Sequence, residues 1–118
     1  MKLVVTGGRD YAMSESDFET LAEVLETLKP EEVCVGCARG VDDTVAWFSM
    51  SKDIPTNRFI ADWESHGKAA GPIRNRYMLD YAGFDAVVLV FPGGKGTADM
   101  EKQAIKRGLT ILRPEGAE

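Results

Sequence analysis

Short runs of apolar, often β-branched residues alternate along this chain with segments in which apolar residues recur every three or four positions. The runs are typical of buried strands, and the recurring spacing is typical of helices that pack one face on a sheet. Strands are predicted at 2–6, 32–36, 57–61, 85–90 and 109–112, and helices at 15–28, 42–51, 72–82 and 97–107. This alternation predicts an α/β fold, a doubly wound sheet of about five mainly parallel strands with helices on both faces.

The longest connection in this pattern is the stretch 62–71, which we expect to be a loop. Pro72 follows it and suits the first turn of a helix, where its missing N–H needs no partner. No repeat, low-complexity tract or linker interrupts the 118 residues. A chain of this length is one domain of ordinary size, so we expect a single ligand-binding domain at 1–118.

The loops that follow the predicted strands carry most of the unusual chemistry. Right-handed crossovers place such loops together at one edge of a parallel sheet, and ligands bind at that edge. Six of the fourteen Lys and Arg residues lie in or just after these loops: Arg9, Arg39, Lys68, Arg74, Arg76 and Lys95. Positive charge gathered at the ligand edge of an acidic chain predicts a small anionic ligand, and glycine-lined backbone with Arg favours phosphate.

The clearest of these loops is 91–97, Phe-Pro-Gly-Gly-Lys-Gly-Thr, which joins a strand to a helix. Its three glycines let the backbone approach a ligand closely. The next helix would begin near Thr97, so its free N–H groups and positive dipole end would face the loop. Such a helix end binds anions, so the sequence predicts a phosphate site here.

The overall charge excludes some partners. A formal net charge of −5 argues against a general nucleic-acid or anionic-membrane binder. The first apolar run, 3–5, is too short for a signal peptide or a membrane span. We therefore expect a cytoplasmic protein, in the host cytoplasm if a phage encodes it.

The two cysteines, Cys34 and Cys37, have the spacing of a C-x-x-C redox pair. Reactive pairs sit at a helix N-terminus, whereas Cys34 lies inside a predicted buried strand. One such pair cannot complete a structural zinc site by itself. We expect a reduced chain with no metal and no cofactor.

Five motifs, in order along nearly the whole chain, resemble the YspA-like branch of the SLOG superfamily. That superfamily is named for the SMF/DprA proteins and the Lonely Guy (LOG) phosphoribohydrolases. The motifs are Val5 to Tyr11, Gly36 to Asp42, Asp62-Trp63, Gly67 to Met78 and Phe91 to Asp99. The resemblance implies a Rossmann-like domain that binds nucleotides or nucleotide-derived molecules, and some SLOG domains are thought to sense or sequester nucleotide signals.

LOG enzymes cleave the N-glycosidic bond of a nucleoside 5′-monophosphate, and their glycine motif reads P-G-G-x-G-T-x-x-E. The last Glu acts in catalysis with an upstream Arg. On this chain the Arg position falls on Arg74, but the Glu position falls on Met100, whose thioether cannot transfer a proton. Asp99 and Glu101 flank it, each turned about 100° away on a helix. If the chain is an enzyme, we expect Arg74, Asp99 and Glu101 to be its catalytic residues.

Residue chemistry predicts how a nucleotide would be held. Gly93, Gly94, Gly96 and Thr97 would cradle a phosphate, and Arg39 and Arg74 would clamp it. Asp42 or Asp43 would accept from ribose hydroxyls or cap a helix. Trp63 would stack on a base or anchor its loop. The full set of predicted ligand-binding residues is Gly7, Gly8, Arg9, Gly36, Arg39, Asp42, Trp63, Lys68, Arg74, Pro92, Gly93, Gly94, Lys95, Gly96 and Thr97.

Two classes of function follow from these features. The first is a binding module, a sensor or sponge for a nucleotide-derived small molecule, which Met100 favours. The second is a LOG-like phosphoribohydrolase or another N-glycosidic hydrolase. A weaker alternative, single-stranded DNA binding as in DprA-like proteins, conflicts with the acidic balance. The relatives often pair through helices, so we expect a homodimer or a higher homo-oligomer.

Overall fold

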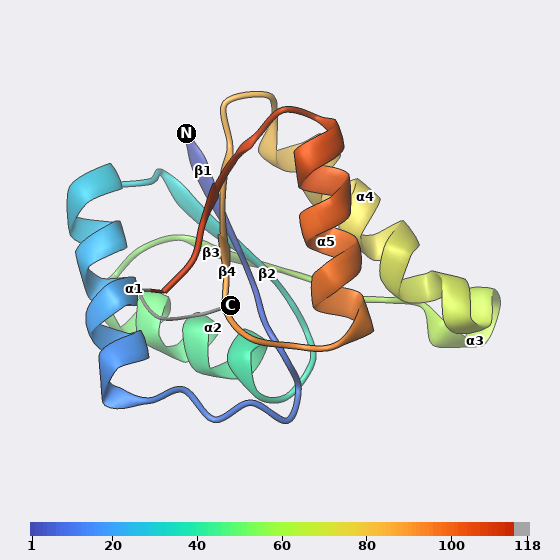
Figure 1. Cartoon of the computed structure of the whole chain (residues 1–118), viewed down its shortest axis with the longest axis horizontal. Helices are drawn as coiled ribbons and strands as arrows, with labels where there is room; N and C mark the ends of the chain where they lie inside the picture. The colour runs from blue at the N-terminus through green and yellow to red at the C-terminus, as the bar shows by residue number, and fades with distance from the viewer. Residues whose placement is uncertain (115–118) are drawn as a thin grey trace.

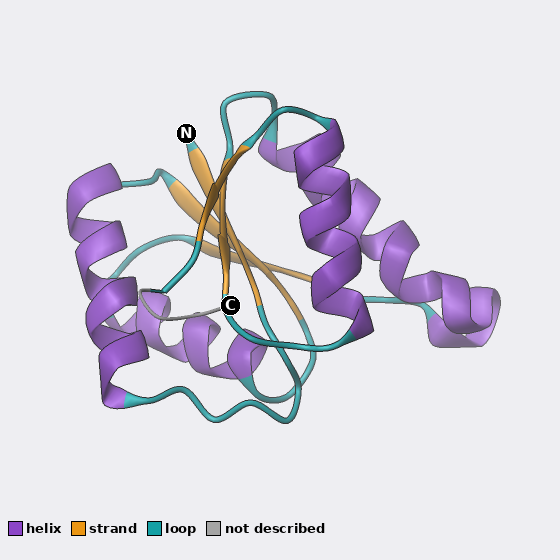
Figure 2. Cartoon of the chain, viewed as in Figure 1, coloured by secondary structure: helices purple, strands orange, loops and turns teal. Residues whose placement is uncertain are grey.

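A computed structural model describes residues 1–114, so the last four residues of the expected domain 1–118 lie outside the described part of the chain. The fold is α/β, with one sheet in which every strand pairing is parallel, as the sequence predicts (Figures 1 and 2). The strand order is β3-β2-β1-β4-β5. The strands are β1 (Lys2–Thr6), β2 (Glu32–Gly36), β3 (Thr56–Phe59), β4 (Val87–Val90) and β5 (Thr110–Leu112).

Helices cover both faces of this sheet. The helices α1 (Glu15–Leu28) and α2 (Val41–Ser51) lie on one face, and α4 (Ala70–Ala82) and α5 (Lys95–Lys106) lie on the other (Figure 1). Successive side chains of a strand point to opposite faces. Leu3 and Val5 of β1 therefore pack with the α1 and α2 side, whereas Val4 between them packs with the α4 and α5 side.

The stretch 62–71, expected to be a loop, contains a short helix, α3 (Trp63–His66), and one 3₁₀ turn, η1 (Gly67–Ala69). The carboxylate of Asp62 caps α3 by accepting a hydrogen bond from the Ser65 N–H at 3.1 Å. The expectation of an irregular loop was therefore wrong, because a local capping interaction suffices to form one helical turn.

Two helices begin two residues earlier than predicted, and α2 begins one residue earlier, at Val41. Helix α4 starts at Ala70, two residues before Pro72, and α5 starts at Lys95, two residues before Thr97. Proline is tolerated anywhere in the first turn, where no N–H has an intrahelical acceptor. The earlier start of α5 brings its N-terminus directly onto the glycines that precede it.

The strand order reverses between β1 and β4, which lie side by side in the sheet although more than eighty residues separate them in the chain. Backbone hydrogen bonds continue the pairing beyond the strand ends. The Phe91 N–H donates to the Thr6 carbonyl, and the Gly8 N–H donates to the Pro92 carbonyl, each at 2.9 Å. The glycine loops after β1 and β4 are thus joined at the switch in strand order, where ligands of such folds bind.

No helix within residues 1–114 combines the length and the apolar composition that crossing a membrane requires.

Candidate ligand-binding cleft

A cleft of about 780 Å³ opens at the carboxyl edge of the sheet, over the switch between β1 and β4. Most of the residues predicted to bind ligand line it, and they lie in or just after the four loops that each connect a predicted strand to a predicted helix. Those lining residues are Gly7, Gly8, Arg9, Asp42, Trp63, Lys68, Arg74, Pro92, Gly93, Gly94, Lys95, Gly96 and Thr97. The chain therefore brings distant glycine and basic segments together in one hollow.

The N-terminus of α5 forms the floor of this cleft. Its N-cap, Gly94, has no side chain to satisfy the first N–H groups, and the first backbone bond of the helix runs from Ala98 N–H to the Gly94 carbonyl at 3.0 Å. The N–H groups of Lys95, Gly96 and Thr97 precede that bond and lack helical acceptors. This helix end offers an anion three backbone donors and the positive end of a dipole.

Close packing around Gly93 sets the shape of that floor. A Cβ at Gly93 would overlap the Thr97 hydroxyl oxygen and lie 2.7 Å from the Gly8 backbone nitrogen. A Cβ at Gly8 would lie 3.0 Å from the Gly93 Cα. The two loops can approach this closely only because both positions are glycine.

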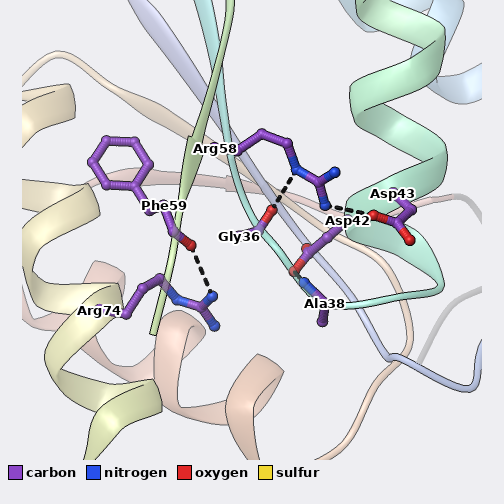
Figure 3. A network of polar contacts seen from close by, with 7 residues as sticks. All are labelled: Gly36, Ala38, Asp42, Asp43, Arg58, Phe59 and Arg74. Carbon is purple, nitrogen blue, oxygen red and sulfur yellow. Dashed lines mark hydrogen bonds and ion pairs between the residues drawn. The ribbon is translucent and has the colours of Figure 1, made fainter. Parts of the chain in front are cut away.

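Arg74 and Asp42 form the wall of the cleft nearest β2 (Figure 3). The Arg74 Nη1 donates to the Phe59 carbonyl at 3.3 Å, and the Asp42 Oδ2 accepts from the Ala38 N–H at 3.2 Å. Both side chains approach Gly36, where a Cβ would overlap the Arg74 guanidinium and the Asp42 carboxylate. Gly36 does not line the cleft itself; its missing side chain makes room for this pair.

Burial shifts the pKa values of both Asp42 and Arg74. Burial raises the pKa of the Asp42 carboxyl, and the Ala38 N–H and the Arg74 charge oppose that rise. Burial likewise lowers the pKa of Arg74, and Asp42 opposes the fall. An arginine remains charged at neutral pH in any case. The cleft therefore holds a partly desolvated cation, Arg74, which forms no ion pair within residues 1–114.

Arg58 supports this wall from behind (Figure 3). Its Nε donates to the Gly36 carbonyl at 3.2 Å, and its Nη2 pairs with the Asp43 carboxylate at 2.6 Å. Asp43 is thus engaged away from the cleft, and Asp42 is the acid of α2 that lines it. The N-cap of α2 is Gly40, with no side-chain cap bond, so Asp42 does not serve as the helix cap.

Asn75 links the Arg74 wall of the cleft to the N-terminus of α5, although its position in the sequence suggested no role. It is only 2% exposed, and its Oδ1 accepts from the Arg74 Nε at 2.9 Å. Its Nδ2 donates to the Gly96 carbonyl at 3.2 Å and to the Asp99 Oδ2 at 3.0 Å. The signal that could have found it is an amide beside Arg74 on a helix face that packs inward. Asn75 fixes Arg74, the α5 N-terminus and Asp99 relative to one another.

The three residues around the LOG Glu position point to three different places. Asp99 lines the cleft, and its Oδ2 also accepts from the Gln103 amide at 2.8 Å. Met100 is 1% exposed and packs in the core beneath α5. Glu101 does not line the cleft and pairs with Arg113 instead.

The remaining predicted residues lie at or beyond the rim. Arg39 is outside the cleft lining and pairs with Asp10 at 2.5 Å, with both side chains exposed. Trp63 is 51% exposed, and its ring lies against the start of α4, where a Cβ at Gly71 would be 3.4 Å from it. Lys68 follows on the same exposed segment. Trp63 can both anchor its segment and present a ring face to the cleft.

The cysteines are free, Cys34 buried and Cys37 exposed. Burial raises the pKa of the Cys34 thiol to about 12, the opposite of what a reactive thiol needs. Among residues 1–114, no group of three or more His, Cys, Asp or Glu side chains is arranged to hold a metal ion.

Comparison with known proteins gives two matches. A family model described as "YspA, cpYpsA-related SLOG family" matches residues 1–66. The chain is also 34% identical over 119 residues to the "Gene 61 protein" of Mycobacterium phage D29, a match that covers 94% of each protein. This similarity to a phage protein is consistent with a phage origin.

Proposed function

Because the chain belongs to the YspA, cpYpsA-related SLOG family, we propose that it binds a nucleotide or nucleotide-derived small molecule in the cleft over β1 and β4. The family makes a nucleotide-related ligand the reasonable expectation. The geometry supports a phosphorylated one, since the hollow combines backbone donors with basic side chains.

The single observation that carries this proposal is the open N-terminus of α5 beside Arg74. Three backbone N–H groups without helical acceptors face a hollow that a guanidinium also lines. Asn75 holds the two parts together through hydrogen bonds to Arg74 and to the Gly96 carbonyl. A phosphate between them would gain both kinds of donor without rearrangement of the protein.

Binding without turnover is the form of this function that we favour. Met100 occupies the position of the LOG catalytic Glu, and its thioether cannot transfer a proton. It is also buried in the core, away from the ligand. A sensor or sponge for a nucleotide signal needs affinity and no general acid or base. We place this role in the cytoplasm, the host's if a phage encodes the protein, where such signals occur.

One observation keeps a hydrolase as a second candidate. Asp99 lines the same cleft as Arg74, and both hydrogen bonds that hold it end on its Oδ2. Its Oδ1 has no protein donor among residues 1–114, so it is available to a ribose hydroxyl or to a water. Asp99 and Arg74 would then act on an N-glycosidic bond in place of the LOG pair.

The test is a thermal-shift series with 5′-AMP, ADP-ribose, NAD and cyclic nucleotides. A ligand that binds only the folded state raises the melting temperature, and millimolar ligand at 100 times its Kd adds about 2.7 kcal/mol. We expect at least one nucleotide to raise it, and Arg74→Gln to abolish that rise. The matched control is Arg113→Gln, which removes an arginine that lies outside the cleft lining and pairs with Glu101.

Two further results decide between the candidates. If no nucleotide at millimolar concentration shifts the melting temperature, the proposed function is wrong. If free base accumulates from 5′-AMP and Asp99→Asn stops it, the chain is a hydrolase rather than a holder of its ligand.

A further inference from the structure

A second hollow, of about 550 Å³, lies between α4 and α5 beside the cleft. Four basic side chains line it: Arg76 from α4, and Lys102, Lys106 and Arg107 from the α5 side. We call it the basic groove. Nothing in the proposed function uses these four residues.

The charge of the basic groove is exceptional for this molecule. The chain carries a formal charge of −5, yet eight of its fourteen Lys and Arg residues line either the cleft or this groove. Arg107 pairs with Asp80 at 2.7 Å. Within residues 1–114, Arg76, Lys102 and Lys106 have no carboxylate within 4.0 Å. The Arg76 guanidinium lies over the Tyr77 ring, 5.6 Å from its centroid, so none of the three charges is neutralised by an acid of the described chain.

The spacing of these cations also lowers the stability of the folded protein. Lys102 and Lys106 stand four residues apart on α5, so they are neighbours on one face of the helix. Like charges at this spacing destabilise a helix, and Arg76 faces the same hollow from α4. A bound anion would remove the repulsion.

The basic groove adjoins the cleft. Pro72 and Asp99 line both hollows, and Gln103 forms the boundary between them. The Gln103 Nε2 donates to the Pro72 carbonyl at 3.0 Å and to the Asp99 Oδ2 at 2.8 Å. Along α5, Lys102 is six residues beyond Gly96, about 9 Å at 1.5 Å per residue. Two joined nucleotide units can bridge such a distance.

We propose that the basic groove is a second anion subsite, and that the ligand is a small molecule with two separated phosphate groups, such as a linear dinucleotide. This inference rests on the proposed function for the first phosphate, which occupies the N-terminus of α5. The second phosphate passes over Pro72 and Gln103 and contacts Arg76, Lys102 and Lys106.

The experiment compares two probes by calorimetry at low salt, 5′-AMP and the linear dinucleotide 5′-pApA. We expect the wild-type protein to bind pApA at least tenfold more tightly than AMP. The Lys102→Gln/Lys106→Gln variant should lose that preference while its affinity for AMP changes less than twofold. Both lysines are exposed on a helix that tolerates glutamine, so the melting temperature without ligand should stay near that of the wild type.

The control is Lys2→Gln/Lys52→Gln, which removes the same charge from residues that line neither hollow and should keep the preference. Equal binding of AMP and pApA by the wild type overturns the second subsite and leaves the proposed function standing. Binding of neither probe overturns the linear dinucleotide as ligand, and the thermal-shift series with the other nucleotides then decides the proposed function by itself. A gain seen with a longer single-stranded DNA but not with pApA overturns the small-molecule assignment and identifies a nucleic-acid partner instead.

Discussion

Arg74 is held in place by its neighbour on α4 and by two strands that are remote in sequence. The Phe59 carbonyl at the end of β3 and the Asn75 side chain accept from it, and the space left by Gly36 of β2 admits it beside Asp42. Such fixed donors lose little entropy when an anion binds, which favours affinity. The same confinement brings Asp42 out of water, and its ionisation is therefore linked to folding.

That linkage gives a prediction for Asp42→Asn. Burial, opposed by the Ala38 N–H and Arg74, raises the pKa of this carboxyl in the folded protein. The folded state therefore binds the proton more tightly than the unfolded state does. The stability contributed by this group falls as pH rises from the unfolded pKa through the raised folded pKa, and is constant above it. Asn removes the fall, so the stability of the variant relative to wild type should increase from about pH 3.5 towards neutrality.

Urea denaturation of both proteins across that range measures the difference directly. A difference that stays constant or decreases with pH would contradict the assignment of a raised pKa to Asp42. Asp43→Asn is the control, because its carboxylate pairs with Arg58 and is exposed.

At the scale of elements, the junction between the β1 loop and the α5 N-terminus depends on glycines in two different ways. Gly93 is fixed by contact, since Thr97 and the Gly8 backbone occupy the space around it. Gly96 is in the first turn of α5, and a Cβ added there would meet nothing within 4 Å. The fold therefore requires a glycine at position 93 but has room for a side chain at position 96.

We therefore expect opposite effects from two alanine substitutions. Gly93→Ala should destabilise the protein by about 1–3 kcal/mol, because backbone atoms of Gly8 cannot yield to a Cβ. Gly96→Ala should stabilise it by about 0.5–1 kcal/mol, the ordinary preference of a helix for alanine. Denaturant unfolding of both variants checks this. Equal effects at the two positions would show that Gly93 has room for a side chain.

At the scale of the whole molecule, the face around α4 carries aromatic side chains that the fold leaves uncovered. The sequence predicts that Tyr77, Met78, Tyr81 and Phe84 belong to the core or to a dimer face. Met78 is buried in the core, but Tyr77 and Tyr81 are exposed and Phe84 is 95% exposed. Exposed apolar side chains that lie near one another are characteristic of contact surfaces.

A homodimer, which remains a prediction, would bury these exposed aromatic side chains between two copies of the chain. If copies of the chain pair through this face, the double variant Tyr77→Ser/Phe84→Ser should sediment as a monomer at concentrations where the wild type sediments as a dimer. Trp47→Ser on α2, an exposed aromatic of the opposite face, should leave the wild-type behaviour unchanged. A wild type that sediments as a monomer at every concentration would end the dimer hypothesis.

The sequence by itself determined the five strands and the four long helices, in their order along the chain. The alternation of buried runs with helical spacing predicted five strands, a parallel sheet and two helical faces, because burial patterns are local and periodic. It also marked the loop that carries Gly93 and the loops that lead into the helices with Arg74 and Asp42, since connections in such a sheet have only one allowed hand. Once the strands and helices are predicted, the residues at the ligand edge of the sheet follow from the sequence alone.

Only the tertiary structure decided which side chains enter the cleft and which bind a partner elsewhere in the protein. Asn75 could not be recognised as the link between Arg74 and α5, because its partners on α5 lie more than twenty residues away in the chain. Arg39 and Glu101 look suitable in the sequence but pair with Asp10 and Arg113, respectively. The basic groove likewise exists only because α4 and α5 pack side by side. Contacts between distant segments depend on how the helices pack, and packing is a property of the folded chain.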